Sequence, residues 1–433
     1  MRERVQTLIH ARFSIVPTTQ HVYNIVSNIN RIKQLKRIIS TLCSIFLIMV
    51  IMLTILTRQG ENRHISSQLY NQLRHFDFGE LDNDNSLIIV SMMDYLPTHI
   101  VKLFEHLTGI NVVLDFVDSA SAMDANLLTD AFAYDIVIPT AWPQMEYHMQ
   151  AGTLQRIDKK KIDMSVFDPD LMTHIRTVRN MEDYCIPYQW GVCGIVINPD
   201  IIERIFPNTK IDSYDFLLNP VHLRKLVHHG VALHGGSDIY NAILVYLGHS
   251  PYTKDQRSLL TAIEYAKSIK NYIARYIDNG DEEVAKGNCA IAIALGSEVR
   301  KKLNHIRKAE MQKPTIYHNI VFIIPKEGAN LWMDVCAIPK RAKHVKNAYA
   351  FLRFLSHPLV SAEISNTISC ATPVTEARQF IRDDLITDPL VYPTSQVVQN
   401  AYVDAYVNRN VHNRKENALL SLKDSNVSIH KNT

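Results

Sequence analysis

From residue 87 onward, two alternating patterns of apolar residues run along the chain. The short apolar runs LIIV (87–90), INVVLDFV (110–117) and YDIVIP (134–139) predict buried strands. Between them, residues 98–109 and 123–132 have apolar positions at helical spacing, and Gly109 ends the first of these helices. Strands that alternate with helices in this way indicate an α/β domain with a parallel sheet.

The alternation continues through the rest of the chain. Residues 184–200 are strand-like, with Gly191 and Gly194 as flexible points. Further buried strands are predicted over 288–296, 319–328 and 335–339, and helical stretches over 213–226, 241–248, 256–275, 281–286 and 346–366. A turn is expected at Asn219-Pro220, and the polar residues after about Arg414 are expected to fray.

One segment near the N-terminus is long and apolar enough to cross a membrane. Residues 38–57 carry no charge and, as a helix, would be about 30 Å long, the thickness of the hydrocarbon core. Lys33, Lys36 and Arg37 precede it, so the positive-inside rule keeps residues 1–37 cytoplasmic and places the chain from Arg58 onward outside. We expect an uncleaved signal-anchor followed by a polar tether over 58–86. A signal peptide that is cleaved remains the alternative.

The charge distribution narrows the kinds of ligand to expect. The chain has 433 residues, enough for two or three domains, and a net charge of +3. Residues 1–37 hold seven cations against one acid, and 38–57 are uncharged, so residues 58–433 carry −3. A mildly acidic body argues against nucleic acid as a partner and suits a cationic ligand.

The chain contains no motif that indicates an enzyme. It lacks the nucleotide-binding glycine loops, the G-x-S-x-G elbow and H-E-x-x-H. The group His228, His229 and His234 matches no common metal spacing, so neither a metal nor another cofactor is expected.

The cysteines are spaced like buried thiols. Cys43 lies in the apolar segment. The other cysteines have no C-x-x-C spacing and are predicted to be buried thiols, with one disulfide among them as the alternative: Cys185, Cys193, Cys289, Cys336 and Cys370.

Five segments, in order, resemble the bacterial periplasmic polyamine-binding proteins, the spermidine/putrescine receptors of ABC importers. They are YDIVIPTAW (134–142), YCIPYQWGVCGIVINPD (184–200), DSYDFLLNPVHLRKL (212–226), IPKEGANLWMDVCAIP (324–339) and DPLVYP (388–393). The resemblance implies the class II periplasmic-binding-protein fold, with two α/β lobes, a hinge and the ligand between the lobes. It places lobe 1 at 87–192 plus 333–379, lobe 2 at 193–332 plus 380–425, and a frayed tail at 426–433.

The resemblance also implies a set of site residues. A polyamine requires carboxylates for its ammonium groups and aromatic faces for its methylenes. The matching acids are Asp94, Asp238, Glu298 and Asp334, and the matching aromatic residues are Tyr95, Trp142 and Trp332. Met92, Met93, Leu295 and Cys370 stand where the family has Trp, a hydroxyl residue, Trp and Tyr. The alternatives are helix capping for Asp94 and Asp238, a solvated helix position for Glu298 and core packing for Trp142. Trp332 with Asp334 is the strongest pair.

The sequence therefore predicts an extracytoplasmic solute-binding protein that captures a putrescine-like or spermidine-like polyamine for an ABC importer. The expected partners are the polyamine, the importer permease and, through residues 38–57, the cytoplasmic membrane; the protein is expected to be a monomer. Its predicted location is the periplasm, tethered to the inner membrane or released by cleavage. The alternative is a degenerate homologue with another cationic ligand or with a sensor or interaction role, since aromatic faces of the pocket are replaced.

Overall fold

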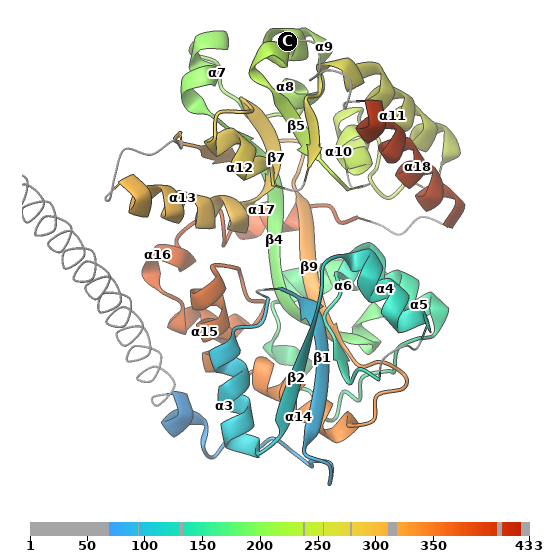
Figure 1. The fold of residues 1–433 in the computed structure, drawn as a ribbon, viewed down its shortest axis with the longest axis vertical. Helices are drawn as coiled ribbons and strands as arrows, with labels where there is room; N and C mark the ends of the chain where they lie inside the picture. Colours follow the sequence, from blue (N-terminus) through green and yellow to red (C-terminus); the bar gives the residue numbers. More distant parts are fainter. Residues whose placement is uncertain are drawn as a thin grey trace, which may run out of the picture. The chain divides into compact units, whose positions relative to one another are not determined.

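Two long antiparallel strands, β4 (Cys185–Ile197) and β9 (Asn330–Ala337), run through both halves of the computed structural model (Figure 1). They pair from Cys185 opposite Ala337 to Cys193 opposite Asn330, with an irregularity between Pro187 and Gln189. All residues of β4 are buried, as expected for a continuous apolar run in the middle of a sheet. The other strands extend the sheet on either side in the order β2-β1-β3-β9-β4-β7-β5-β6, and β8 pairs with β4.

The structure describes residues 69–93, 95–129, 133–236, 239–253, 255–277, 279–310, 318–404 and 409–425. Leu69–Thr433 forms one compact unit. The predicted cytoplasmic segment 1–37, the predicted span 38–57, Cys43 and the tail 426–433 lie outside the described residues. Among the helices that the structure does describe, none is long and apolar enough to cross a membrane.

The first lobe is built on parallel strands, as the alternating pattern predicted. β1 (Ser86–Met92) pairs in parallel with β2 (Asn111–Val117) and with β3 (Ile136–Val137). Its helices are α3 (Thr98–Thr108), α4 (Ala120–Thr129), α5 (Glu146–Ala151), α6 (Pro169–Ile175), α14 (Val345–Leu355), α15 (Pro358–Ile368), α16 (Asp383–Ile386) and α17 (Ser395–Gln399). The single helix predicted over 346–366 divides into α14 and α15, because Pro358 has no N–H to continue the first helix.

The second lobe has its own group of parallel strands. β5 (Val231–His234) pairs in parallel with β6 (Arg275–Ile277) and β7 (Ile291–Leu295), and β8 is Val321–Ile323. The helices are α7 (Pro199–Ile205), α8 (Asp215–Leu218), α9 (Pro220–Leu226), α10 (Ile239–Tyr246), α11 (Gln256–Ile269), α12 (Gly280–Ala285), α13 (Gly296–Glu310) and α18 (Arg409–Ser425). The predicted turn at Asn219-Pro220 is confirmed, with the Asn219 side chain capping α9. The helix predicted over 256–275 ends earlier, at Ile269, and β6 follows it.

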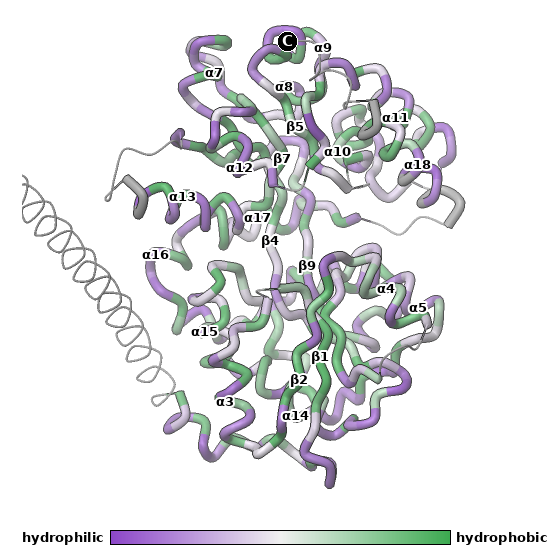
Figure 2. The backbone as a smooth tube through the Cα atoms, in the orientation of Figure 1, coloured by the Kyte–Doolittle hydropathy of each residue, from purple (hydrophilic) through white to green (hydrophobic). Residues whose placement is uncertain are grey.

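Each lobe has its own hydrophobic core. In β4 the first core ends at Trp190 and the second begins at Cys193. Hydrophobic positions follow β1 and β2, whereas α16 on the outside is hydrophilic (Figure 2). Residues 381–403, which the sequence assigned to lobe 2, contact both lobes. Leu385, Val391 and Val398 belong to the first core, while Asp384 and Asp388 form ion pairs with Arg300 of α13.

Two segments expected to be loose are packed. Residues 69–73 are helical, and Leu69 and Leu73, one helical turn apart, lie in the first core, so the predicted tether does not reach to residue 86. At the other end, Leu419 and Leu422 of α18 lie in the second core, so the expectation of fraying after about Arg414 was wrong as far as Ser425. In both segments a few apolar residues are spread among many polar ones.

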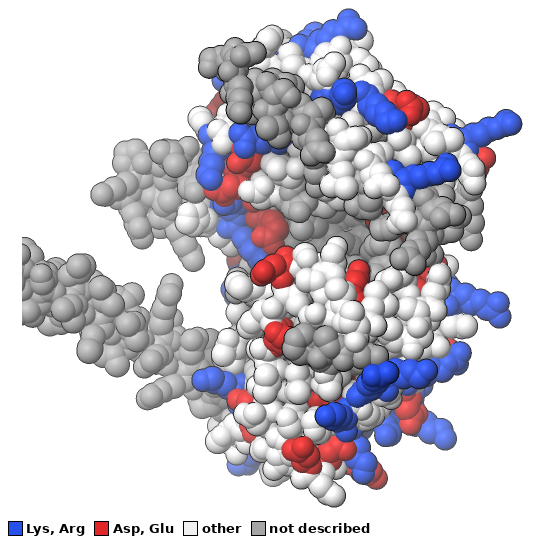
Figure 3. All heavy atoms as spheres, turned by 45° about the vertical axis from the view of Figure 1, so that its right-hand side comes forward, with Lys and Arg blue, Asp and Glu red and all other residues white. Residues whose placement is uncertain are grey.

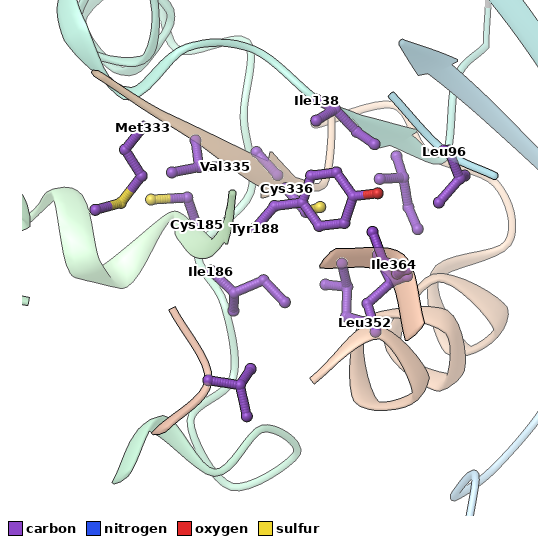
Figure 4. Packing of buried hydrophobic residues seen from close by; sticks show 14 of the residues in the cluster. Leu96, Ile138, Cys185, Ile186, Tyr188, Met333, Val335, Cys336, Leu352 and Ile364 are labelled. Carbon is purple, nitrogen blue, oxygen red and sulfur yellow. The ribbon is translucent and has the colours of Figure 1, made fainter. Parts of the chain in front are cut away.

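The five cysteines within the described residues are buried and form no disulfide with one another, as predicted. Cys185 and Cys336 lie in the first core beside Met333 and Tyr188 (Figure 4). Burial raises the pKa of both thiols, so they behave as small apolar side chains.

Candidate functional site

Asp334 is a buried carboxyl group at the boundary between the two lobes. It lies in β9, opposite Gln189 of β4, and a backbone bridge joins it to Thr140. Its side chain is 2% exposed, and this burial raises the pKa of the carboxyl to about 8. Within the part of the chain described, no Lys or Arg forms an ion pair with it, and its Oδ2 has no hydrogen-bond partner. A carboxyl group in this state can accept a cation from outside the protein.

The phenol of Tyr95 interacts electrostatically with this carboxyl. The negative charge of Asp334 is the main cause that raises the pKa of Tyr95. The Tyr95 carbonyl accepts hydrogen bonds from the Tyr188 hydroxyl at 2.7 Å and from Gln189 Nε2 at 3.3 Å. The Tyr188 ring is packed in the first core (Figure 4), so the loop that carries Tyr95 is fixed to β4.

Trp332 lies two residues before Asp334 and is paired with Gly191 of β4. Its indole covers this glycine closely: a Cβ at residue 191 would lie 2.8 Å from Cζ2 and 3.0 Å from Nε1. The sequence indicated Gly191 as a flexible point, whereas in the structure it provides the space for the indole. Trp332 Nε1 is buried and has no hydrogen-bond partner among the residues described.

A second tryptophan, Trp142, lies two residues after Thr140, whose backbone pairs with Asp334. Trp142 is buried, and its Nε1 also has no hydrogen-bond partner among the described residues. Buried tryptophan N–H groups usually find a hydrogen-bond acceptor. Both indole N–H groups and Asp334 Oδ2 are thus buried polar atoms without a partner among the described residues, on segments that adjoin along β9 and at Thr140.

Glu298 and Cys370 both interact electrostatically with Tyr95. Leu295, at the end of β7, pairs with Cys193, and Glu298 follows in the first turn of α13. The charges of Asp334 and Glu298 both contribute to the raised pKa of Cys370, for which burial is the main cause. Glu298 likewise contributes to the raised pKa of Tyr95.

A hollow of about 950 Å³ adjoins Glu298 on the side of the second lobe. It lies where β6 and β7 end and α12 and α13 begin, and it is lined by Tyr276, Ile277, Asn279, Asp281, Glu282, Glu298, Lys301, Lys302 and His305. Figure 3 shows acidic and basic side chains next to one another at the level where the lobes meet. No group of side chains among the residues described is arranged to hold a metal ion.

Electrostatic interactions thus link Tyr95 and Cys370 to Asp334 and Glu298, and Trp332 lies two residues before Asp334 on β9. Asp94 and Asp238 lie outside the described residues. Met92 ends β1 and packs against the first core, while Met93 is 62% exposed. Three residues were not predicted from the sequence: Tyr188 and Gln189, which hold Tyr95, and Lys301, which pairs with Glu298 at 2.8 Å. The spacing of Glu298 and Lys301 on a helix was the available signal for the last of these.

The known proteins that resemble this chain are bacterial solute-binding proteins. Residues 99–393 match the family described as bacterial extracellular solute-binding protein. The putrescine-binding periplasmic protein SpuD of Pseudomonas aeruginosa is 31% identical over 74% of this chain and 87% of its own length. The putrescine-binding periplasmic protein PotF of Escherichia coli is 30% identical over 72% of this chain and 84% of its own length.

Solved structures agree on the fold. The substrate-binding protein PotD of a spermidine/putrescine ABC transporter from Streptococcus pneumoniae has a TM-score of 0.66 at 22% identity, covering 79% of this chain and 99% of its own. The PotD lipoprotein of Treponema pallidum has a TM-score of 0.64 at 20% identity, covering 77% and 99%. The expected periplasmic-binding-protein fold is therefore confirmed, and the matching family consists of solute-binding proteins rather than enzymes. This chain belongs to the family of bacterial extracellular solute-binding proteins.

Proposed function

We propose that this protein captures a polyamine of the putrescine or spermidine type outside the cytoplasm and delivers it to an ABC importer. The observation that carries the proposal is Asp334, a carboxyl group that is 2% exposed, without a cation among the described residues and with one oxygen unpaired. An ammonium group placed there would supply both the missing charge and the missing hydrogen-bond donor. The relatives named for putrescine and spermidine binding support this class of ligand.

The aromatic residues around Asp334 suit the rest of such a ligand. An aliphatic ammonium pairs favourably with an indole or phenol face, and the methylenes between two ammonium groups pack on the same rings. Trp332 and Tyr95 are next to Asp334 in space or along β9, and Trp142 is on the adjoining segment. We assign Asp94, Asp238 and Glu298 to the other ammonium groups of the ligand, on the basis of the family pattern.

We also propose a periplasmic location with residues 38–57 as a membrane anchor. The relatives are periplasmic proteins by name, and the uncharged segment is long enough to span the hydrocarbon core. N-terminal sequencing of the natural protein, isolated from whole cells, tests the anchor. A mature N-terminus between Thr54 and Gly60 would show cleavage and release instead.

Calorimetric titration of the full chain with putrescine and spermidine tests the ligand. We expect binding in the micromolar range or tighter, and a loss of about 2–5 kcal/mol for Asp334→Asn, because one cation is then left unpaired in a desolvated site. Glu264→Gln is the matched control, since it removes the same charge from an exposed position on α11. Asp334→Asn binding as tightly as wild type would reject this site.

The substituted positions separate a polyamine site from a site for another cation. Met92 and Leu295 stand where the family has tryptophan, so the double substitution Met92→Trp/Leu295→Trp restores two aromatic faces. If the site binds polyamines weakly because these faces are missing, the double variant should bind them more tightly. If the site instead fits a cation of another shape, wild type should bind neither polyamine, and the double variant should show no higher affinity for them.

A further inference from the structure

Glu298, one of the proposed ligand acids, already has a cation. Lys301 Nζ lies 2.8 Å from Glu298 Oε1, and the two residues are three positions apart on α13, the spacing at which helical side chains meet. Each side chain is 44% exposed, so the ion pair is at the surface of the hollow rather than inside the protein. Asp334, in contrast, has no such partner among the described residues.

The pair is also placed to meet a ligand that is bound at Asp334. Leu295 is opposite Cys193 on β4, two residues from Gly191, which lies beneath the Trp332 indole. Glu298 follows one helical turn after Leu295. The charges of both Glu298 and Lys301 influence the Cys370 thiol, which also responds to Asp334. The Glu298–Lys301 pair of the second lobe and the Asp334 carboxyl of the first lobe therefore both interact electrostatically with Cys370.

We propose that Lys301 is a specificity-determining residue that competes with the ligand's second ammonium group for Glu298. This inference rests on the proposed function. The Lys301 ammonium has the same charge and donors as the end of a polyamine, and it is tethered three residues from the acid that a polyamine would use. A ligand with ammonium groups at both ends must displace Lys301 or share Glu298 with it. The resident pair thus lowers the affinity for diamines and triamines.

The neighbouring lysine offers a matched control. Lys302 is on the same helix and lines the same hollow, but it forms a close ion pair with Glu282, not with Glu298. Substituting either lysine with glutamine removes one positive charge from α13. A general effect of net charge would therefore be the same for both, while competition for Glu298 involves Lys301 alone.

The experiment is calorimetry with putrescine and spermidine on the full chain and its variants. Lys301→Gln should bind both ligands about two- to fivefold more tightly, the range expected for releasing an exposed ion pair. Lys301→Arg, which keeps the cation, and Lys302→Gln should bind like wild type. The gain should shrink at high salt and disappear in a Glu298→Gln background, because no acid is then left to release.

The outcomes separate this inference from the proposed function. If wild type binds polyamine through Asp334 but Lys301→Gln binds equally or less tightly, the competition is rejected and the function stands. An equal gain for Lys302→Gln would also reject it, in favour of net charge. If neither wild type nor Lys301→Gln binds a polyamine, the proposed function itself fails.

Discussion

The Asp334 carboxyl holds its proton far more tightly than an exposed aspartate does. Burial raises its pKa from the ordinary 3.8 to about 8, although the interaction with Tyr95 acts in the opposite direction. The folded, empty protein therefore binds this proton more strongly than the unfolded chain does. The resulting contribution to stability is full below about pH 4 and is lost as the pH rises through about 8.

The same proton predicts a pH dependence of binding. An aliphatic ammonium stays charged up to about pH 10, so it pairs with the ionised carboxylate and must displace the proton below pH 8. We expect affinity to fall by up to about tenfold per pH unit below pH 8 and to level off above it. Calorimetry at pH 7 in buffers of different ionisation enthalpy should show proton release by wild type. A pH-independent affinity between pH 6 and 8 would contradict this assignment.

Gly191 gives a second prediction at the residue scale. A methyl group at this position would lie 2.8 Å from the Trp332 ring, so Gly191→Ala must move the indole. If the indole face contacts the ligand, affinity should fall by about two- to thirtyfold, the range of one cation–π contact. Adding Gly191→Ala to Trp332→Leu should then cost little more than Trp332→Leu alone. Additive losses in calorimetric titrations would show that Gly191 acts through the strand and not through the ring.

Part of this site was predictable from the sequence, and part was not. The pair of Trp332 and Asp334 was predicted through the resemblance to the polyamine-binding proteins. The predicted strand began only at Val335, so the burial of Asp334 within β9 was not predicted. The contact between Trp332 and Gly191 depends on the register of β4 against β9, which joins residues 141 positions apart, and no local pattern contains it. The Tyr188 hydrogen bond to the Tyr95 carbonyl is equally non-local.

At the scale of elements, the strongly periodic segments were predicted correctly and the sparsely apolar ones were not. The helix over 98–109 and its end at Gly109 are confirmed, with Gly109 in the left-handed conformation at φ 74°. The α18 segment was taken for a frayed tail because polar residues outnumber apolar ones. Its place is decided by Leu419 and Leu422 in the second core and by buried Lys415, which donates to Asn241 of α10 at 3.2 Å. Tertiary packing, not propensity, forms this helix.

Two adjacent leucines of α18 test this packing. Leu419 is 2% exposed, whereas Leu420 is 55% exposed. Leu419→Ala should lower the free energy of unfolding by about 2–5 kcal/mol, because it removes buried methyl groups and leaves a cavity. Leu420→Ala, the same substitution on the same helix, should change it by less than about 0.5 kcal/mol. Urea denaturation measures both. Equal, small effects would show that α18 is not docked.

At the scale of the whole described unit, the two cores are joined by continuous strands. β4 and β9 remain paired across the boundary, from Trp190 opposite Met333 to Cys193 opposite Asn330. A relative movement of the lobes must therefore bend both strands together over these few residues. Asp334 and Trp332 are at this boundary, so a ligand held there is in a position to favour one relative orientation of the lobes over another.

Small-angle X-ray scattering tests whether the lobes close on the ligand. Saturating polyamine should reduce the radius of gyration of wild type, because a ligand bound from both lobes gains contacts only when they approach. Asp334→Asn under the same conditions should show no reduction, since it lacks the buried partner for the ammonium group. Lys301→Gln should still compact, because the pair that it breaks limits affinity and not the hinge. A ligand that binds by calorimetry while the scattering of wild type stays unchanged would contradict closure and leave a site that is complete within one orientation of the lobes.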